Sequence, residues 1–273
     1  MIKYYTRACN FYYGSISKEK IKKKLSLPLN GNNLISFDTI EIITRKYKKK
    51  IHIKKIKKQS KKIKEKINKD IKLIIQKKKF KGLNFLDFPI LMGVINLTPD
   101  SFSDGGKYNV GKKSFIQILH MIKSGAKIID VGGESTRPGS KTISSQSEWN
   151  RIKHVIKKFK KKHKFSCLSI DTRKSDVMIK SIKYNVDLIN DVSGFTFDKN
   201  ALKKIKIFNL PKVLHHMQGT PNTMQKNPKY KNVLLDIYDF FEKNINEKFK
   251  DNKIILDPGI GFGKTLKHNL TLI

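Results

Sequence analysis

Six short apolar runs of this chain each lead into side chains that can bind a ligand. The polar residues at the ends of these runs are Asn96, Asp130, Asp171, Asn190 with Asp191, His215 with His216, Met217 and Gln218, and Asp257. A single Asp after a strand is usually a helix N-cap. Six such positions in succession instead predict one site, because the carboxyl ends of parallel strands lie on one edge of a sheet.

These residue types favour recognition of a small polar heterocycle. The carboxylates of Asp171 and Asp257 can accept paired N–H donors from an amino-pyrimidinone edge, and the amide of Asn190 can both donate and accept. Buried polar groups reject ligands that leave them unpaired, so such a site would be selective.

Other chemistries find little support in the sequence. It contains no supported Ser–His–acid arrangement, no Cys cluster and no H-E-x-x-H motif. The stretch "GFGK" (261–264) resembles a phosphate-binding loop, but Gly259 lies five residues before Lys264, one short of the G-x-x-x-x-G-K-[ST] spacing. We interpret these glycines as a tight loop above the strand ends.

The elements that must position the polar residues alternate regularly from residue 89 onward. Apolar strands are predicted at 89–96, 127–133, 166–172, 186–191, 212–217 and 253–259. Helices are predicted at 113–125, 145–162, 174–185, 200–209 and 230–250. This α/β pattern implies parallel strands, in either an open doubly wound sheet or a (β/α)8 barrel. The barrel better explains polar residues after every strand, since an open sheet concentrates its ligand contacts at one switch point.

Residues 1–88 differ from the rest in composition. The stretch 46–81 is rich in Lys and Ile, and the isoleucines at 63, 67, 71, 74 and 75 have helical spacing. The segment 34–43 alternates in polarity and is rich in β-branched residues, which predicts a strand. Because 1–88 contains no catalytic constellation, we interpret it as a basic accessory extension of a domain at 89–273. A nucleic-acid or membrane-surface role is the alternative.

The charge balance is strongly basic, with 59 Lys and Arg against 22 Asp and Glu and a net charge of +37. The lysines are spread along the chain without a recognition motif, and only three alanines occur, which is typical of an AT-rich genome rather than of nucleic-acid binding. No apolar run reaches the length of a membrane span. The distant Cys9 and Cys167 fit two free thiols in a reducing cytoplasm.

At the strand ends the sequence resembles dihydropteroate synthase. The stretches that carry this resemblance are "MGVINLTPDSFSDGG" (92–106), "IIDVGGESTRPGS" (128–140), "SIDTRK" (169–174), "LINDVSG" (188–194), "HHMQGTPNTMQ" (215–225) and "ILDPGIGFGKTLKHN" (255–269). They cover about residues 89–273 and leave 1–88 outside.

The resemblance implies a (β/α)8 barrel, a transferase and, for the complete protein, a homodimer. The implied reaction joins 4-aminobenzoate to (7,8-dihydropterin-6-yl)methyl diphosphate and releases diphosphate with Mg2+. Asn96 would help to hold the diphosphate-bound Mg2+, and it is implied to be catalytic together with Asp171 and Asp257.

The resemblance also implies two substrate pockets. Asp171, Asn190 and Asp257 would bind the pterin edge, with Met217 against its face. The aminobenzoate pocket would comprise Phe102 on a first loop, Phe262, and the second-loop residues Thr136, Arg137 and Pro138.

The chain departs from the family pattern at its end. The family continues through a seventh strand with a Ser-Arg-Lys motif and an eighth with an Arg-x-His motif, whereas this sequence stops at Ile273. We therefore expect an incomplete barrel of about six strands, from a C-terminally truncated chain. A pterin-binding methyltransferase-type domain and an inactive fragment are the alternatives, and the loop motifs "TPDSFSDGG" and "GGESTRPG" favour the synthase.

Overall fold

The computed structural model describes residues 2–78, 89–98, 110–135, 140–162, 166–249 and 253–273, with the backbone alone at 110–112 and 162. These residues divide into two compact units, an N-terminal unit up to residue 78 together with Pro89, and a second unit from Ile90 to Ile273.

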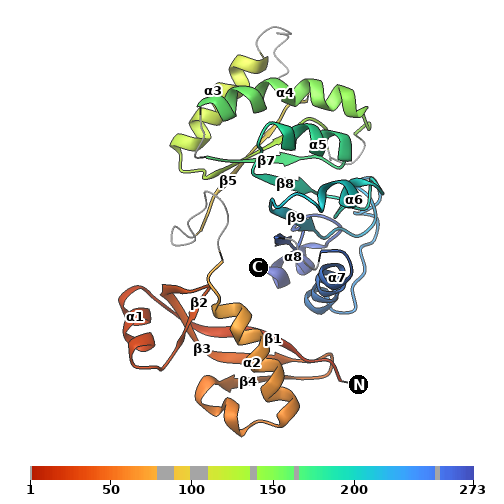
Figure 1. Ribbon diagram of the computed structural model, residues 1–273. Coiled ribbons are helices and arrows are strands. Elements are labelled where there is room, and N and C mark those ends of the chain that lie inside the picture. Colours follow the sequence, from red (N-terminus) through yellow and green to blue (C-terminus); the bar gives the residue numbers. More distant parts are fainter. Residues whose placement is uncertain (1, 79–88, 99–109, 136–139, 163–165, 250–252) are drawn as a thin grey trace. The chain divides into compact units, whose positions relative to one another are not determined.

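The N-terminal unit is an antiparallel sheet with helices (Figure 1). Its elements are β1 (Tyr5–Tyr13), α1 (Gly14–Lys22), β2 (Leu27–Leu29), β3 (Asn32–Ile43), β4 (Lys48–His52), the 3-10 helix η1 (Ile53–Lys58) and α2 (Lys61–Ile75). The long strand β3 pairs with the other three strands and confirms the strand predicted at 34–43.

Isoleucines of α2 close the core of this unit. Ile67 is fully buried against Phe37, Ile40 and Ile42 of β3. The other members of the predicted stripe, Ile63, Ile71, Ile74 and Ile75, pack on the same cluster, so the helical stripe is confirmed. The sequence pattern did not reveal β4, whose three lysines are exposed while only Ile51 is buried.

The second unit alternates strands and helices. Its elements are β5 (Met92–Asn96), α3 (Val110–Lys123), β6 (Ile128–Gly132), α4 (Ser145–Lys162), β7 (Cys167–Asp171), α5 (Ser175–Lys183), β8 (Leu188–Asp191), α6 (Ala201–Ile205), β9 (Lys212–His215), α7 (Val233–Lys248), β10 (Ile254–Asp257) and α8 (Leu266–Leu272). Every predicted strand and helix from 89 to 259 is present, although most are shorter than predicted.

The strand order decides between the two candidate architectures. Among the described residues, six parallel strands lie side by side in chain order from β5 to β10. A doubly wound sheet would reverse this order at a switch point, whereas a barrel adds each strand beside the previous one. The unit is therefore an incomplete (β/α) barrel, as predicted.

The two faces of the parallel sheet carry different side chains, because successive residues of a strand point to opposite sides. One face packs against the helices through Ile95, Ile129, Val131, Leu168, Ile170, Ile189 and Leu214. The opposite face, which is the barrel interior, has a smaller apolar cluster of Ile90, Ile128, Cys167, Leu188, Val213 and Ile255. This cluster forms a floor beneath the residues at the strand ends.

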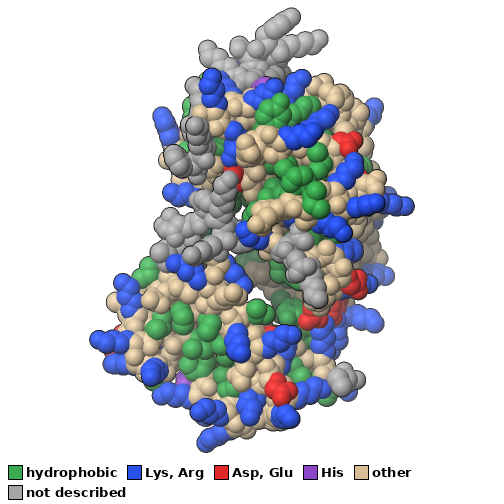
Figure 2. Space-filling view, in the orientation of Figure 1, with side chains coloured by type: hydrophobic (Ala, Val, Ile, Leu, Met, Phe, Trp, Pro, Cys, Tyr) green, Lys and Arg blue, Asp and Glu red, His purple; other side chains and the backbone are tan. Residues whose placement is uncertain are grey.

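Lysine and arginine side chains are scattered over the visible surface of each unit rather than gathered in one patch (Figure 2). None of the described helices is both long and apolar enough to cross a membrane.

We expect the helix-facing core to dominate the stability of the second unit. Ile118 of α3 is fully buried, so Ile118→Ala should lower the free energy of unfolding by about 2–5 kcal/mol. Ile116, on the same helix, is 58% exposed, and Ile116→Ala should cost less than about 0.5 kcal/mol. Urea denaturation followed by fluorescence of Trp149, the single tryptophan of the chain, reports on this unit. Equal losses in the two variants would contradict this packing.

Candidate active site

Register places three predicted site residues in one row across the sheet. Asn96 lies beside Gly132, Gly132 beside Asp171, and Asp171 beside Asn190. Gly132 is the one member of this row without a side chain. A Cβ there would lie 3.0 Å from Asn96 Oδ1 and 3.4 Å from Asp171 Oδ2. The two oxygens therefore approach the same small space, which a larger residue would fill.

A buried carboxylate orients Asn190. Asn190 Nδ2 donates to Asp130 Oδ2 at 2.9 Å, and Asp130 is 2% exposed. Asp130 lies within β6, two residues before its end, and not after the strand as the sequence suggested. Asn190 Oδ1 is buried and has no hydrogen-bond partner among the described residues. Because an unpaired buried acceptor is costly, this oxygen is suited to receive a ligand donor.

Carboxylates crowd this part of the site. Burial raises the pKa of Asp171 well above its usual value, and the charges of Asp130 and Asp191 raise it further. The guanidinium of Arg173 partly opposes them. A ligand that offers N–H donors would favour the ionised form of Asp171, since such donors stabilise a carboxylate.

The end of β10 forms the second part of the site. Asp257 lies beside His215 of β9, and its Oδ1 accepts from the Gly259 amide at 2.8 Å. Gly259 has a φ of +69°, and a Cβ at this position would lie 2.0 Å from the His216 carbonyl oxygen. Glycine is therefore required at 259. The turn that it permits orients the carboxylate of Asp257 through the hydrogen bond from the Gly259 amide.

Two buried side chains support the turn from beneath. His215 Nδ1 lies 2.7 Å from the Val192 carbonyl, which assigns the proton to Nδ1, and burial lowers the pKa of His215. Lys264 Nζ donates to the Phe262 carbonyl at 2.9 Å and lies 3.2 Å from His216 Nδ1. Burial lowers the pKa of Lys264 to about 8.

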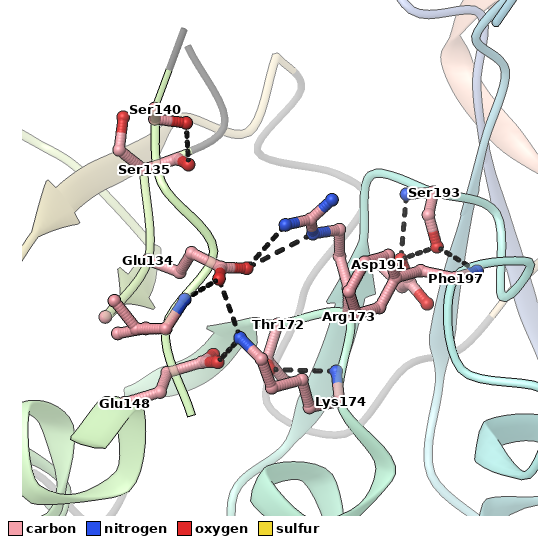
Figure 3. Close-up of polar contacts among 12 residues, drawn as sticks. Glu134, Ser135, Ser140, Glu148, Thr172, Arg173, Lys174, Asp191, Ser193 and Phe197 are labelled. Carbon is pink, nitrogen blue, oxygen red and sulfur yellow. Dashed lines mark hydrogen bonds and ion pairs between the residues drawn. The ribbon is translucent and has the colours of Figure 1, made fainter. Parts of the chain in front are cut away.

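A four-residue charge network underlies the loop between β6 and α4 (Figure 3). Arg173 Nη2 donates to Glu134 Oε2 at 2.7 Å, and Lys174 Nζ donates to Glu134 Oε1 at 2.8 Å and to Glu148 Oε2 at 2.6 Å. Both acids and both bases are buried. Burial alone would raise the pKa of Glu134, but the hydrogen bonds from Lys174, Arg173 and the Ile143 amide lower it below its usual value.

Met217 lines a hollow of about 330 Å³ at the same edge of the sheet. Its other lining residues are Ser135, Ser140, Thr142, Arg173, Ser193, Thr196, Phe197, Gly219, Thr220, Pro221 and Asn222. A larger hollow of about 740 Å³ lies in the N-terminal unit, where Lys49, Lys50 and Lys55 line it, and it contains none of the predicted site residues.

The structure brings the predicted strand-end residues to one edge, and Phe262 lies there with its ring 4.7 Å from that of His215. Phe102, Thr136, Arg137 and Pro138 lie outside the described residues. Among the described residues, no cluster of three His, Cys, Asp or Glu side chains could hold a metal by itself.

The sequence analysis placed Asp130 at a strand end without giving it a role, and it did not single out Glu134, Arg173 or Lys174. Each lies within one of the quoted motifs, and Arg173 and Lys174 follow Asp171 almost directly. Their only signal in the sequence is that they are charged residues within stretches predicted to be buried strands and tight loops.

Comparison with known proteins identifies the second unit. The family model described as pterin binding enzyme matches residues 92–273. The dihydropteroate synthase of Haemophilus influenzae is 41% identical over 193 residues, which cover 69% of this chain and 69% of that protein. The chain belongs to the dihydropteroate synthase family. The resemblance based on the six sequence stretches is thereby confirmed.

Solved dihydropteroate synthases share the fold. The Yersinia pestis enzyme, determined in a sulfonamide drug complex, is 40% identical with a TM-score of 0.65, covering 71% of this chain and 72% of that one. The Xanthomonas albilineans enzyme with 4-aminobenzoic acid is 33% identical with a TM-score of 0.60, covering 69% and 68%.

The buried carboxylate of Asp191 gives a pH prediction. Burial raises its pKa from 3.8 to about 6, although the Ser193 amide and hydroxyl donate to Oδ1. Between these values the folded protein binds more protons than the unfolded one, so the free energy of unfolding falls as pH rises. Asp191→Asn keeps an acceptor for Ser193 and should gain up to about 3 kcal/mol relative to the parent between pH 3.5 and pH 7.

Urea denaturation of both proteins across this pH range measures the difference. Asp176→Asn, at an exposed position on α5, serves as the control and should show no comparable change. A stability difference between the Asp191 variant and its parent that is flat with pH would contradict the raised pKa.

Proposed function

We propose that this protein condenses 4-aminobenzoate with (7,8-dihydropterin-6-yl)methyl diphosphate to give 7,8-dihydropteroate and diphosphate. The observation that supports this most directly is the row of Asn96, Asp171 and Asn190, with Asp257 at the end of β10 on the same edge of the sheet, above an apolar floor. Such an arrangement offers hydrogen-bond acceptors at one edge and a dry surface for a flat heterocycle.

The pterin edge would be read by three side chains. Asp171 and Asp257 would accept N–H donors of the ring, and Asn190 would use its unpaired Oδ1 while Asp130 holds its amide nitrogen. Met217, which lines the adjoining hollow, would lie against the ring face. This division gives the buried Asn190 Oδ1 a partner once the ring is bound.

The chemistry requires orientation more than a strong base. The methylene C–O bond to diphosphate breaks, the aminobenzoate nitrogen forms the new C–N bond, and that nitrogen loses a proton. Breaking the C–O bond leaves positive charge that the electron-rich pterin can share, so the protein's contribution is to align the two substrates and exclude water.

A magnesium ion fits the residues on the open side of the row. Mg2+ prefers oxygen ligands and commonly combines one or two protein oxygens with substrate phosphates and water. Asn96 Oδ1, which faces the space above Gly132, would supply such an oxygen. When bound, the ion would neutralise charge on the departing diphosphate.

The aminobenzoate pocket is proposed from the family resemblance. It would combine Phe262, which packs against His215, with Phe102, Thr136, Arg137 and Pro138. The same resemblance leads us to propose a homodimer in the cytoplasm, with small molecules rather than nucleic acid or membrane as its ligands.

Pterin affinity should depend on Asp257. In Asp257→Asn, the amide oxygen can still accept from Gly259, but the NH2 group would face a ring donor, so binding should weaken by about 2–4 kcal/mol, or roughly 30- to 1000-fold. Calorimetry with the pterin diphosphate measures this loss. Asp176→Asn, which removes the same charge from an exposed position on α5, should change the affinity less than about twofold. Unchanged affinity in the Asp257 variant would exclude it from the site.

The N-terminal unit should be dispensable for pterin binding. All described residues that we assign to the site lie in the second unit, and the N-terminal unit has a hydrophobic core of its own. Removal of residues 1–88 should therefore leave the pterin Kd within about threefold, which is less than 1 kcal/mol. Calorimetry compares the two proteins after circular dichroism has shown that the shorter one is folded. A loss of a hundredfold or more would assign the N-terminal unit a part in the site.

A further inference from the structure

Glu134 connects the two ends of the loop between β6 and α4. It lies at the start of the loop, two residues after β6, and its Oε1 accepts from the amide of Ile143 at the far end, at 3.0 Å. Ser140 Oγ also donates to the Ser135 carbonyl at 2.6 Å, so the base of the loop is tied twice. Both contacts join the start of the loop to residues near its end.

The same carboxylate reaches the strand that carries Asp171. Its other oxygen accepts from Arg173 Nη2 at 2.7 Å and Nε at 3.3 Å, and Lys174 Nζ approaches Oε1 at 2.8 Å. Arg173 and Lys174 follow the end of β7 by two and three residues. One side chain thus joins the loop base to the strand end (Figure 3).

Each cation of the network is also held from a second side. The Arg173 guanidinium stacks over the Phe197 ring, 4.1 Å from its centroid, and Lys174 is shared with Glu148 of α4. A buried ion pair often adds little net stability compared with apolar packing, but its directional hydrogen bonds restrict geometry. The network is therefore better suited to setting a distance than to holding the fold together.

We propose that Glu134 is a positioning residue that holds the base of the β6–α4 loop at a fixed separation from the strand end carrying Asp171. This inference rests on the proposed function, in which Asp171 binds the pterin and the β6–α4 loop serves the aminobenzoate. We call these contacts of Glu134 with Ile143, Arg173 and Lys174 the clamp. Without the clamp, the β6–α4 loop would shift relative to Asp171. The affinity for the pterin would then change little, whereas binding of 4-aminobenzoate would weaken because its loop would be displaced from the pterin.

Glu148 provides the matched control. It is a buried Glu in the same network and accepts a hydrogen bond from Lys174 Nζ, but no contact links its carboxylate to Ile143 or Arg173 in the described structure. Glu134→Gln and Glu148→Gln therefore remove the same charge from the same cluster, and only the first acts on the loop base.

Hydrogen exchange of the backbone amides at 140–144 in the free protein tests the clamp directly. Glu134→Gln should speed this exchange by about tenfold or more, and Glu148→Gln by less than about threefold, while exchange in α5 stays similar in both. Glu134→Asp keeps the charge but is one methylene too short to reach Ile143 and Arg173 together. It should behave like Glu134→Gln and serves if that variant does not fold.

Steady-state kinetics and calorimetry test the consequence. Glu134→Gln should raise the KM for 4-aminobenzoate by about tenfold or more with the pterin Kd within about twofold, and Glu148→Gln should change neither beyond about threefold. Equal effects of the two Gln variants, or unchanged exchange in both Glu134 variants, would overturn the proposal, as would faster exchange with an unchanged KM. A parent protein that binds no pterin would contradict the proposed function instead, and the exchange result would still decide whether Glu134 holds the loop.

Discussion

The site depends on the two-residue alternation of side chains along parallel strands that lie in register. Alternate residues point to opposite faces, so each strand contributes helix-facing apolar side chains and interior side chains from one short segment. The interior positions are apolar at the amino ends, as at Ile128 and Leu188, and polar at the carboxyl ends, as at Asp171 and Asn190. A slip of one residue in a single strand would exchange these faces and remove its member from the row.

Electrostatics set the second constraint. The chain carries far more lysine than acid, yet three of its carboxylates lie in the interior of the second unit, where burial raises the pKa of Asp130, Asp171 and Asp191. The charge of Arg173, which also pairs with Glu134, acts in the opposite direction and lowers the pKa of Asp171. Surface lysines contribute little to this balance, since exposed charges are screened by solvent.

Much of this architecture could be predicted because it follows from local pattern. Short apolar runs ending in Asn96, Asp171 and Asp257 reveal both the strands and the polar edge. Other features depend on contacts that no local pattern contains. Glu134 meets Lys174 across 40 residues of chain, and β4 exists only because β3 offers it an edge. Lysines on an edge strand and on a solvated helix look alike in sequence.

The hydrogen bond between Asp130 and Asn190 means that a residue outside the binding space can influence which ligand the site prefers. Asn190 faces the binding space, but the direction of its amide is set by a carboxylate two strands away that is itself closed to solvent. A neutral residue at 130 would allow the amide to rotate and exchange its donor for its acceptor. The preference of such a site could therefore drift during evolution while every residue that touches the ligand stayed the same.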